Sequence, residues 1–121
     1  MKDHKELDVW KNSMDLVAQV YSVTREFPKE ELYGLTNQIR RAAVSIPSNI
    51  SEGAARNSDK EFVQFLHVAL GSAAELETQL LIAKRLKYMN QIDVLTDNLS
   101  SVMKMLSGLI RHYKKKAVNR D

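Results

Sequence analysis

The sequence predicts an all-α protein that folds as an antiparallel, up-down four-helix bundle. The composition is poor in helix breakers, with four Gly and two Pro among 121 residues, and it is rich in Leu, Ala, Lys, Glu and Gln. Apolar residues recur at steps of three and four in four separate stretches, which is helical spacing. Short connections join these stretches, and short connections place neighbouring helices antiparallel.

The whole chain, residues 1–121, is expected to form one domain. No apolar run approaches the roughly 18 residues that span a bilayer, and the first ten residues lack the apolar core of a signal peptide. The absence of cysteine excludes disulfides and thiolate metal sites and suits a reducing compartment. We therefore expect a cytoplasmic protein without a membrane partner. The net charge of +3 is a mild basic excess that says little about partners on its own.

The first helix is expected over about residues 8–25, and its apolar stripe is unusually wide. A wide stripe favours contacts on two sides, with the rest of the bundle and with another subunit. The pattern stops at Phe27-Pro28, because the residue before a proline is held out of the helical region. The stripe comprises Leu7, Trp10, Met14, Val17, Tyr21 and Thr24, and it is widened by Val9, Leu16 and Val20.

The second helix, expected over about residues 35–56, organises the rest of the chain. Pro47 lies inside its apolar pattern, so we expect a kinked, mostly buried helix. Gly34 allows the chain to turn before this helix, and Thr36 is a candidate N-cap. The apolar positions are Leu35, Ile39, Ala42, Ala43, Ile46 and Ile50.

The third helix is expected over about residues 59–88. Ser58 and Glu61 form a capping-box pattern at its start, which is the firmest boundary in the chain. A run of small residues, from Ala69 to Ala74, favours the close approach of another helix. A gap that faces a ligand is the alternative.

The fourth helix is expected over about residues 92–113, followed by a frayed basic tail at 114–121. Its apolar line is Ile92, Leu95, Leu99, Val102, Leu106, Leu109 and Tyr113, and it leaves Met103, Met105 and Ile110 outside.

Catalytic and metal-binding patterns are missing from the sequence. The three histidines, His4, His67 and His112, have no second histidine or paired carboxylate at the spacing of a bundle metal site. The four glycines are too far apart for a phosphate-binding loop. We therefore expect no enzymatic activity, no cofactor and no metal.

Basic residues are the remaining functional signal. The candidates for phosphate contacts are Arg40, Arg41, Arg56, Arg111, Lys114, Lys115 and Lys116. The alternative is that these cations only offset helix dipoles and solvate the surface. Arg40 and Arg41 lie 100° apart on a helix, so one approaches the core and needs a carboxylate there. Glu52, Glu75, Glu77 or a second subunit could supply it, and a structural role for this arginine pair stays open beside anion binding.

Dense motifs over about residues 7–88 resemble the four-helix-bundle proteins encoded in intervening sequences of bacterial 23S ribosomal RNA genes. The chain also looks like the accessory protein of diversity-generating retroelements. The motifs are Val9-Trp10, Phe27-Pro28, Tyr33-Gly34-Leu35-Thr36, Gln38-Ile39-Arg40-Arg41-Ala42-Ala43, Ser45-Ile46, Asn49-Ile50, Glu52-Gly53, Arg56, Glu61-Phe62, Phe65-Leu66, Ala69-Leu70-Gly71-Ser72 and Glu75-Leu76-Glu77-Thr78-Gln79-Leu80. Ser51 departs from the alanine that is common in relatives.

The resemblance implies a homopentamer with basic surfaces, for which nucleic-acid binding has been proposed. It carries no catalytic residues, and the function of most members is unknown. Fivefold repetition would turn scattered cations into rings, and a ring binds a polyanion more strongly than one copy. Two functions follow as hypotheses. The first is non-specific binding of RNA or DNA, and the rival is a scaffold or accessory subunit that docks a partner protein such as a polymerase.

Overall fold

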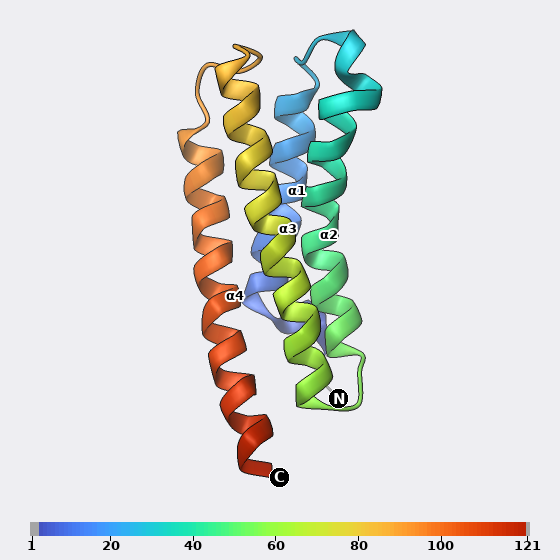
Figure 1. Cartoon of the computed structure of the whole chain (residues 1–121), viewed down its shortest axis with the longest axis vertical. Helices are drawn as coiled ribbons and strands as arrows, with labels where there is room; N and C mark the ends of the chain where they lie inside the picture. The colour runs from blue at the N-terminus through green and yellow to red at the C-terminus, as the bar shows by residue number, and fades with distance from the viewer. Residues whose placement is uncertain (1–2, 121) are drawn as a thin grey trace.

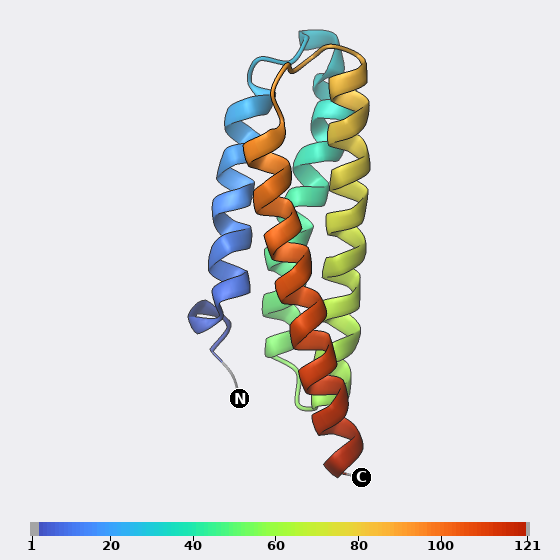
Figure 2. The same cartoon turned by 90° about the vertical axis from the view of Figure 1, so that its left-hand side faces the viewer.

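Four long α-helices lie side by side and run alternately in opposite directions (Figures 1 and 2). The computed structural model describes the backbone of residues 3–120 and the side chains of residues 3–118. The helices are α1 (Asp8–Thr24), α2 (Asn37–Ala54), α3 (Asp59–Arg85) and α4 (Asp93–Arg120), and no strand occurs within 3–120. The predicted all-α four-helix bundle is confirmed.

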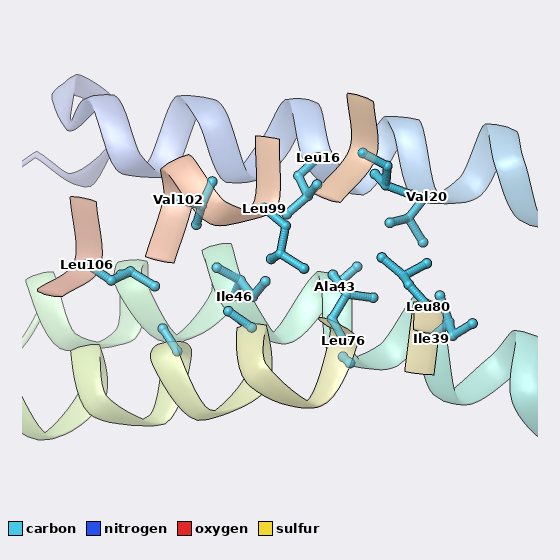
Figure 3. Close-up of a cluster of buried hydrophobic side chains, with 14 of the residues drawn as sticks. Leu16, Val20, Ile39, Ala43, Ile46, Leu76, Leu80, Leu99, Val102 and Leu106 are labelled. Atoms are coloured by element: carbon cyan, nitrogen blue, oxygen red, sulfur yellow. The ribbon is translucent and has the colours of Figure 1, made fainter. Parts of the chain in front are cut away.

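All four helices contribute side chains to one apolar core. Leu16, Ile46, Leu76 and Leu99, one from each helix, are 0–1% exposed and meet at the centre of the bundle (Figure 3). Burial of each such side chain contributes roughly 1.5–3 kcal/mol. Pro47 lies inside α2 and is buried, as are Ala43 and Ile46. α2 packs most extensively against α3, in keeping with its predicted organising role.

The predicted core line of α1 is wrong at two of its six positions. Met14 and Tyr21 are 44% and 38% exposed, whereas Leu16 and Val20 are buried. α1 therefore turns Val9, Leu16 and Val20 toward the core, although these residues were expected only to widen the stripe. The cause is that both sets alternate steps of three and four, so spacing alone does not distinguish them. The buried residues of α1 are Val9, Ser13, Leu16, Val20 and Thr24.

The connection from α1 to α2 is organised by Glu31. A 3-10 turn over Lys29–Glu31 is followed by a kinked turn over Leu32–Thr36, in which Gly34 has a non-helical φ of −113° and ψ of −114°. The Glu31 carboxylate accepts one hydrogen bond from the Leu35 backbone N–H at 3.3 Å and another from the Tyr88 hydroxyl at 2.7 Å. A Cβ at Gly34 would lie 2.9 Å from Glu31 Oε1, so glycine makes room for this carboxylate. The predicted Thr36 cap is wrong, because Thr36 has helical backbone angles and makes no capping hydrogen bond.

The connection from α2 to α3 contains the predicted capping box. The Ser58 hydroxyl accepts a hydrogen bond from the Glu61 backbone N–H at 3.1 Å, and its Oγ lies 3.2 Å from Glu61 Oε2. Just before it, α2 approaches α3 very closely at Gly53. A Cβ there would lie 2.6 Å from Phe65 Cβ and 2.9 Å from the Phe62 ring. The sequence analysis did not identify this approach.

The small residues of α3 divide between two faces. Ala69 and Ala73 are buried, and the Ser72 hydroxyl hydrogen-bonds that of Ser45 in α2 at 2.8 Å. Gly71 instead faces outward, with no atom within 4 Å of where its Cβ would lie. The predicted close approach of another helix to the small residues of α3 therefore occurs on the inner face of α3, where α2 packs. α3 ends at Arg85 rather than near residue 88, and Lys87 adopts a left-handed φ of 65° just after it.

α4 is longer than predicted, and its predicted apolar line is confirmed from Ile92 to Leu106 and differs only at its end. Ile110 is 7% exposed and belongs to the core, although the sequence placed it outside. The helix continues to Arg120, so the prediction of a frayed tail from Lys114 is wrong for residues 114–120. Tyr113 packs on Phe62 with ring centroids 4.9 Å apart, which extends tertiary contact to this region. Residue 121 and the side chains of residues 119 and 120 lie outside the described part of the chain.

Candidate nucleic-acid interface

The candidate basic residues occupy two opposite ends of the bundle. We call the lower end the one where α2 and α4 finish and α3 begins, at the bottom of Figure 1, and the upper end the opposite one. Arg56 and the cations of α4 share the lower end, as expected (Figure 2). Arg41 lies 15 residues before Arg56 on α2, which is about 22 Å along a helix. The seven candidates therefore do not form one patch in a single chain.

Arg40 is held by neighbours on α1. Its Nε donates a hydrogen bond to Thr24 Oγ1 at 2.8 Å, and its guanidinium lies 4.7 Å from the centre of the Tyr21 ring. The Thr24 hydroxyl in turn donates to the Val20 carbonyl at 2.8 Å. This half-buried arginine therefore joins α2 to the end of α1.

The expected carboxylate partner for the arginine pair is not present within residues 3–118. Neither Arg40 nor Arg41 has a described carboxylate oxygen within 4 Å. A hydroxyl acceptor and an aromatic face take its place at Arg40, because both stabilise a guanidinium without a full ion pair. Arg41 is exposed on the outer side of α2.

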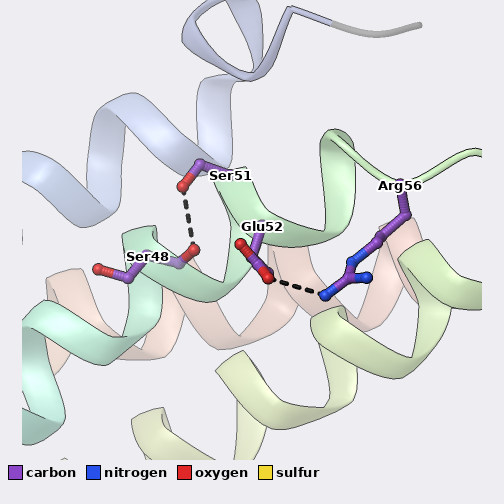
Figure 4. A network of polar contacts seen from close by, with 4 residues as sticks. All are labelled: Ser48, Ser51, Glu52 and Arg56. Carbon is purple, nitrogen blue, oxygen red and sulfur yellow. Dashed lines mark hydrogen bonds and ion pairs between the residues drawn. The ribbon is translucent and has the colours of Figure 1, made fainter.

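Arg56 is engaged by its own surroundings. Its guanidinium pairs with Glu52 at 2.8 Å, one turn earlier in the chain, and lies 4.8 Å from the centre of the Phe65 ring (Figure 4). The side chains are 42% and 55% exposed, so the ion pair contributes less than about 1 kcal/mol. A phosphate that approaches Arg56 must compete with this nearby carboxylate.

Three of the four candidate cations of α4 are as unengaged as Arg41. Arg111, Lys114 and Lys115 are exposed and make no ion pair with any residue in the described part of the chain. Lys116 is half-buried, with its ammonium 5.5 Å from the centre of the Tyr113 ring. A basic surface with free charges therefore follows the last turns of α4.

Lys104 extends this basic surface upward along α4. It lies seven residues before Arg111 and eleven before Lys115, and both separations return to nearly the same face of a helix. Lys104 was not among the predicted candidates, because it lies outside the dense cluster that begins at Arg111. The spacing of seven was the available signal.

A groove runs between α3 and α4 beside these cations. Leu70 and Glu77 line it from α3, and the α4 side is formed by Ser100, Met103, Lys104, Ser107 and Arg111. A Cβ at Gly108 would lie 3.9 Å from Arg111 Nη2, so the guanidinium lies back over this glycine. Two cations, two hydroxyls and one carboxylate thus share one shallow, partly apolar site.

Other types of site are not formed by the described residues. Within residues 3–118, no group of three or more histidine, aspartate or glutamate side chains is placed to hold a metal ion. None of the helices described is both long and apolar enough to cross a membrane.

Comparisons with known proteins agree with this architecture. The model of the 23S rRNA-intervening sequence protein family matches residues 5–108. A crystal structure of a protein of unknown function from the S23 ribosomal protein family of Bacteroides thetaiotaomicron is similar, with a TM-score of 0.79 and 24% identity. The similarity covers 85% of this chain and 95% of that one, and no curated protein matches. The chain therefore belongs to the family of 23S rRNA-intervening sequence proteins.

Proposed function

We propose that this protein is a non-enzymatic, cytoplasmic bundle that binds RNA or DNA non-specifically through phosphate contacts. The observation that carries the proposal is the set of exposed α4 cations, Arg111, Lys114 and Lys115, which have no ion-pair partner among the described residues. Cations that only stabilise a fold are engaged by neighbours, as Arg40 and Arg56 are. Contacts to phosphates position a protein on nucleic acid without reading sequence.

We further propose that the protein works as a homopentamer. Exposed apolar side chains on the outer faces support assembly, because Val68, Leu81 and Ile82 of α3 are 51%, 52% and 44% exposed. Gly71 adds an open position between them where a second copy could approach closely. Repetition around a ring would place several copies of each α4 cation on one face and strengthen binding to a polyanion.

A salt series tests the binding proposal directly. Labelled RNA and labelled duplex DNA are titrated with the protein at several salt concentrations, after light scattering has established the mass of the oligomer. We expect the affinity to fall steeply with salt, because each neutralised phosphate releases counterions. The triple variant Lys114→Glu, Lys115→Glu, Lys116→Glu should lose binding.

The matched control is Lys84→Glu, Arg85→Glu, Lys87→Glu, which makes the same change of charge at the upper end. This control should keep most of its affinity. Equal losses of nucleic-acid affinity in both triple variants would show that binding depends only on the net charge of the protein and not on the position of the cations. No binding by the unmodified protein at low salt would refute the proposal.

The second candidate is a scaffold that docks a partner protein such as a polymerase. The same exposed apolar residues of α3 favour it, since they would suit a protein partner as well as another subunit. Ile82→Glu tests the exposed face of α3, and light scattering shows whether it also changes the mass of the oligomer. If the mass is unchanged, loss of partner binding with retained nucleic-acid binding favours the scaffold.

A further inference from the structure

We infer that the groove between α3 and α4 binds the sugar–phosphate backbone of a single-stranded nucleic acid, with Lys104 and Arg111 each contacting one phosphate. The inference rests on the proposed function and adds two phosphate contacts to those expected from the last turns of α4. The groove is lined by Leu70, Glu77, Ser100, Met103, Lys104, Ser107 and Arg111.

The α4 side of the groove repeats one arrangement of side chains. Ser100 precedes Lys104 by four residues, and Ser107 precedes Arg111 by four, so the two pairs are seven residues apart. Seven residues complete nearly two helical turns and advance about 10.5 Å. Each pair combines a hydroxyl donor with a cation, which together can hold the oxygens of one phosphate. The repeat thus presents two equivalent phosphate contacts along one line.

The cations of the groove are free to take a new partner. Neither the Lys104 ammonium nor the Arg111 guanidinium has a carboxylate within 4 Å among the described residues, unlike the Arg56 guanidinium. Gly108 keeps open the space over which Arg111 lies, since a Cβ there would be 3.9 Å from Arg111 Nη2. Side chains on a helix lean toward its N-terminus, so this position turns Arg111 toward Ser107 and Lys104.

The shape of the groove favours one strand over a duplex. The site is shallow, and only two adjacent helices line it. A duplex is a stiff, wide rod, so it would meet the cations at the edge of the site but not the apolar side chains within it. A single strand is flexible enough to lay its sugars and bases on the half-buried Leu70 and Met103.

Glu77 opposes binding in this groove. It is half-buried on the α3 side, and its carboxylate has neither Lys104 nor Arg111 within 4 Å. A phosphate placed between the two cations would be repelled by this charge. Glu77→Gln should therefore strengthen binding several-fold, whereas it would have no such effect on a site formed by the last turns of α4.

The test compares two double variants that lose the same charge. Lys104→Gln, Arg111→Gln removes the groove cations, and Lys84→Gln, Arg85→Gln removes two cations at the end of α3. Binding is measured by fluorescence anisotropy with a labelled oligonucleotide as RNA, as single-stranded DNA and as a duplex, over a salt series. The groove variant should bind single strands at least tenfold more weakly at low salt. The slope of log binding constant against log salt concentration should become shallower by about 1.4, because two phosphate contacts are lost and each contributes about 0.7.

A variant without charge change separates groove shape from electrostatics. Ser107→Leu fills the groove and should weaken single-strand binding, whereas a purely electrostatic surface would keep its affinity. Circular dichroism and thermal unfolding of each variant check that the bundle remains folded.

Three results would overturn the inference. If the unmodified protein binds with a steep salt slope but Lys104→Gln, Arg111→Gln binds equally well, the groove is wrong and the proposed function stands. If duplex and single strands bind equally, the single-strand assignment is wrong. If no nucleic acid binds at low salt, the proposed function itself fails.

Discussion

The two ends of the bundle carry basic residues in different situations. At the upper end, Arg40 is bound by Thr24 and Tyr21 of α1, and Glu31 joins two connections through Tyr88 and Leu35. Along the lower half of α4, Arg111 and its neighbours face solvent without ion-pair partners among the described residues. Side chains of similar chemistry therefore stabilise the fold at one position, as Arg40 does, and remain available for a ligand at another, as Arg111 does.

This difference shows that the number of cations is a poor guide to a binding surface. Arg40 and Arg41 are adjacent in the chain, yet one is half-buried and engaged while the other is exposed. A cation with local partners must release them before it binds a phosphate, whereas a solvated one releases only water and counterions. Engagement, rather than charge alone, therefore identifies the cations that are available to a ligand.

The largest expected effect concerns the close packing at the lower end. Gly53→Ala would place a Cβ 2.6 Å from Phe65 Cβ, so α2 and α3 must move apart there. We expect a loss of about 1–3 kcal/mol in the free energy of unfolding, measured by urea denaturation.

Gly71→Ala is the matched control for this glycine. It adds the same methyl group on the outer face of α3, where no atom lies within 4 Å. A gain of up to about 1 kcal/mol is expected from helix propensity. If Gly53→Ala were as stable as Gly71→Ala, the close approach would not exist in solution. A changed mass in light scattering for Gly71→Ala would place this face in a subunit interface.

The second effect tests the structural role of Arg40. Arg40→Ala removes the hydrogen bond to Thr24 and the contact with Tyr21, and it should cost about 1–2 kcal/mol of stability. Arg41→Ala removes the same charge from an exposed neighbour and should change stability by less than about 0.5 kcal/mol. Nucleic-acid affinity should be similar for both variants. A clear loss of affinity in either variant would show that this arginine contributes to nucleic-acid binding.

Local signals were predicted from the sequence more reliably than tertiary ones. The capping box at Ser58 and Glu61 depends on residues three apart, and it is formed as expected. The core line of α1 was misassigned because Met14 and Leu16 both belong to regular helical patterns. Only contact with the other helices decides which set is buried.

The remaining errors have the same origin. The kinked turn at Leu32–Thr36 depends on Glu31 and on Tyr88, which lies 57 residues from Glu31 in the chain. Tyr113 packs on Phe62 of α3, which is a tertiary contact near the end of α4 that spacing alone did not indicate. At the candidate site, the sequence supplied the cations after Arg111, but it did not show which of them are engaged or that Lys104 shares their face.

The third prediction compares the stability effects of substitutions at the starts of α2 and α3. Ser58→Ala removes a formed cap and should cost about 1 kcal/mol in urea denaturation. Thr36→Val should cost nothing or stabilise the protein, since the Thr36 hydroxyl is buried without a hydrogen-bond partner and valine has the same shape. A large loss in Thr36→Val would mean that this hydroxyl has a partner in solution.

The smallest effect is a pH dependence at the upper end. The hydrogen bond to the Glu31 carboxylate is the main cause that raises the pKa of the Tyr88 hydroxyl above its ordinary value, and burial adds to it. The protonated hydroxyl is thus favoured in the folded state. Its contribution to stability is complete below the ordinary pKa of about 10 and is lost as the pH rises through the higher folded pKa.

Tyr88→Phe removes this titration and should therefore be less sensitive to pH above about 10 than the unmodified protein. Urea denaturation at pH 8 and pH 11 measures the difference, and lysines that titrate in the same range are common to both proteins. Tyr33→Phe is the control, because Tyr33 is 91% exposed. If all three proteins lost stability equally at high pH, the bond between Tyr88 and Glu31 would be absent in solution. The upper end would then be held by Arg40 and by the Phe27–Tyr88 ring contact, with no ionic contribution from Glu31.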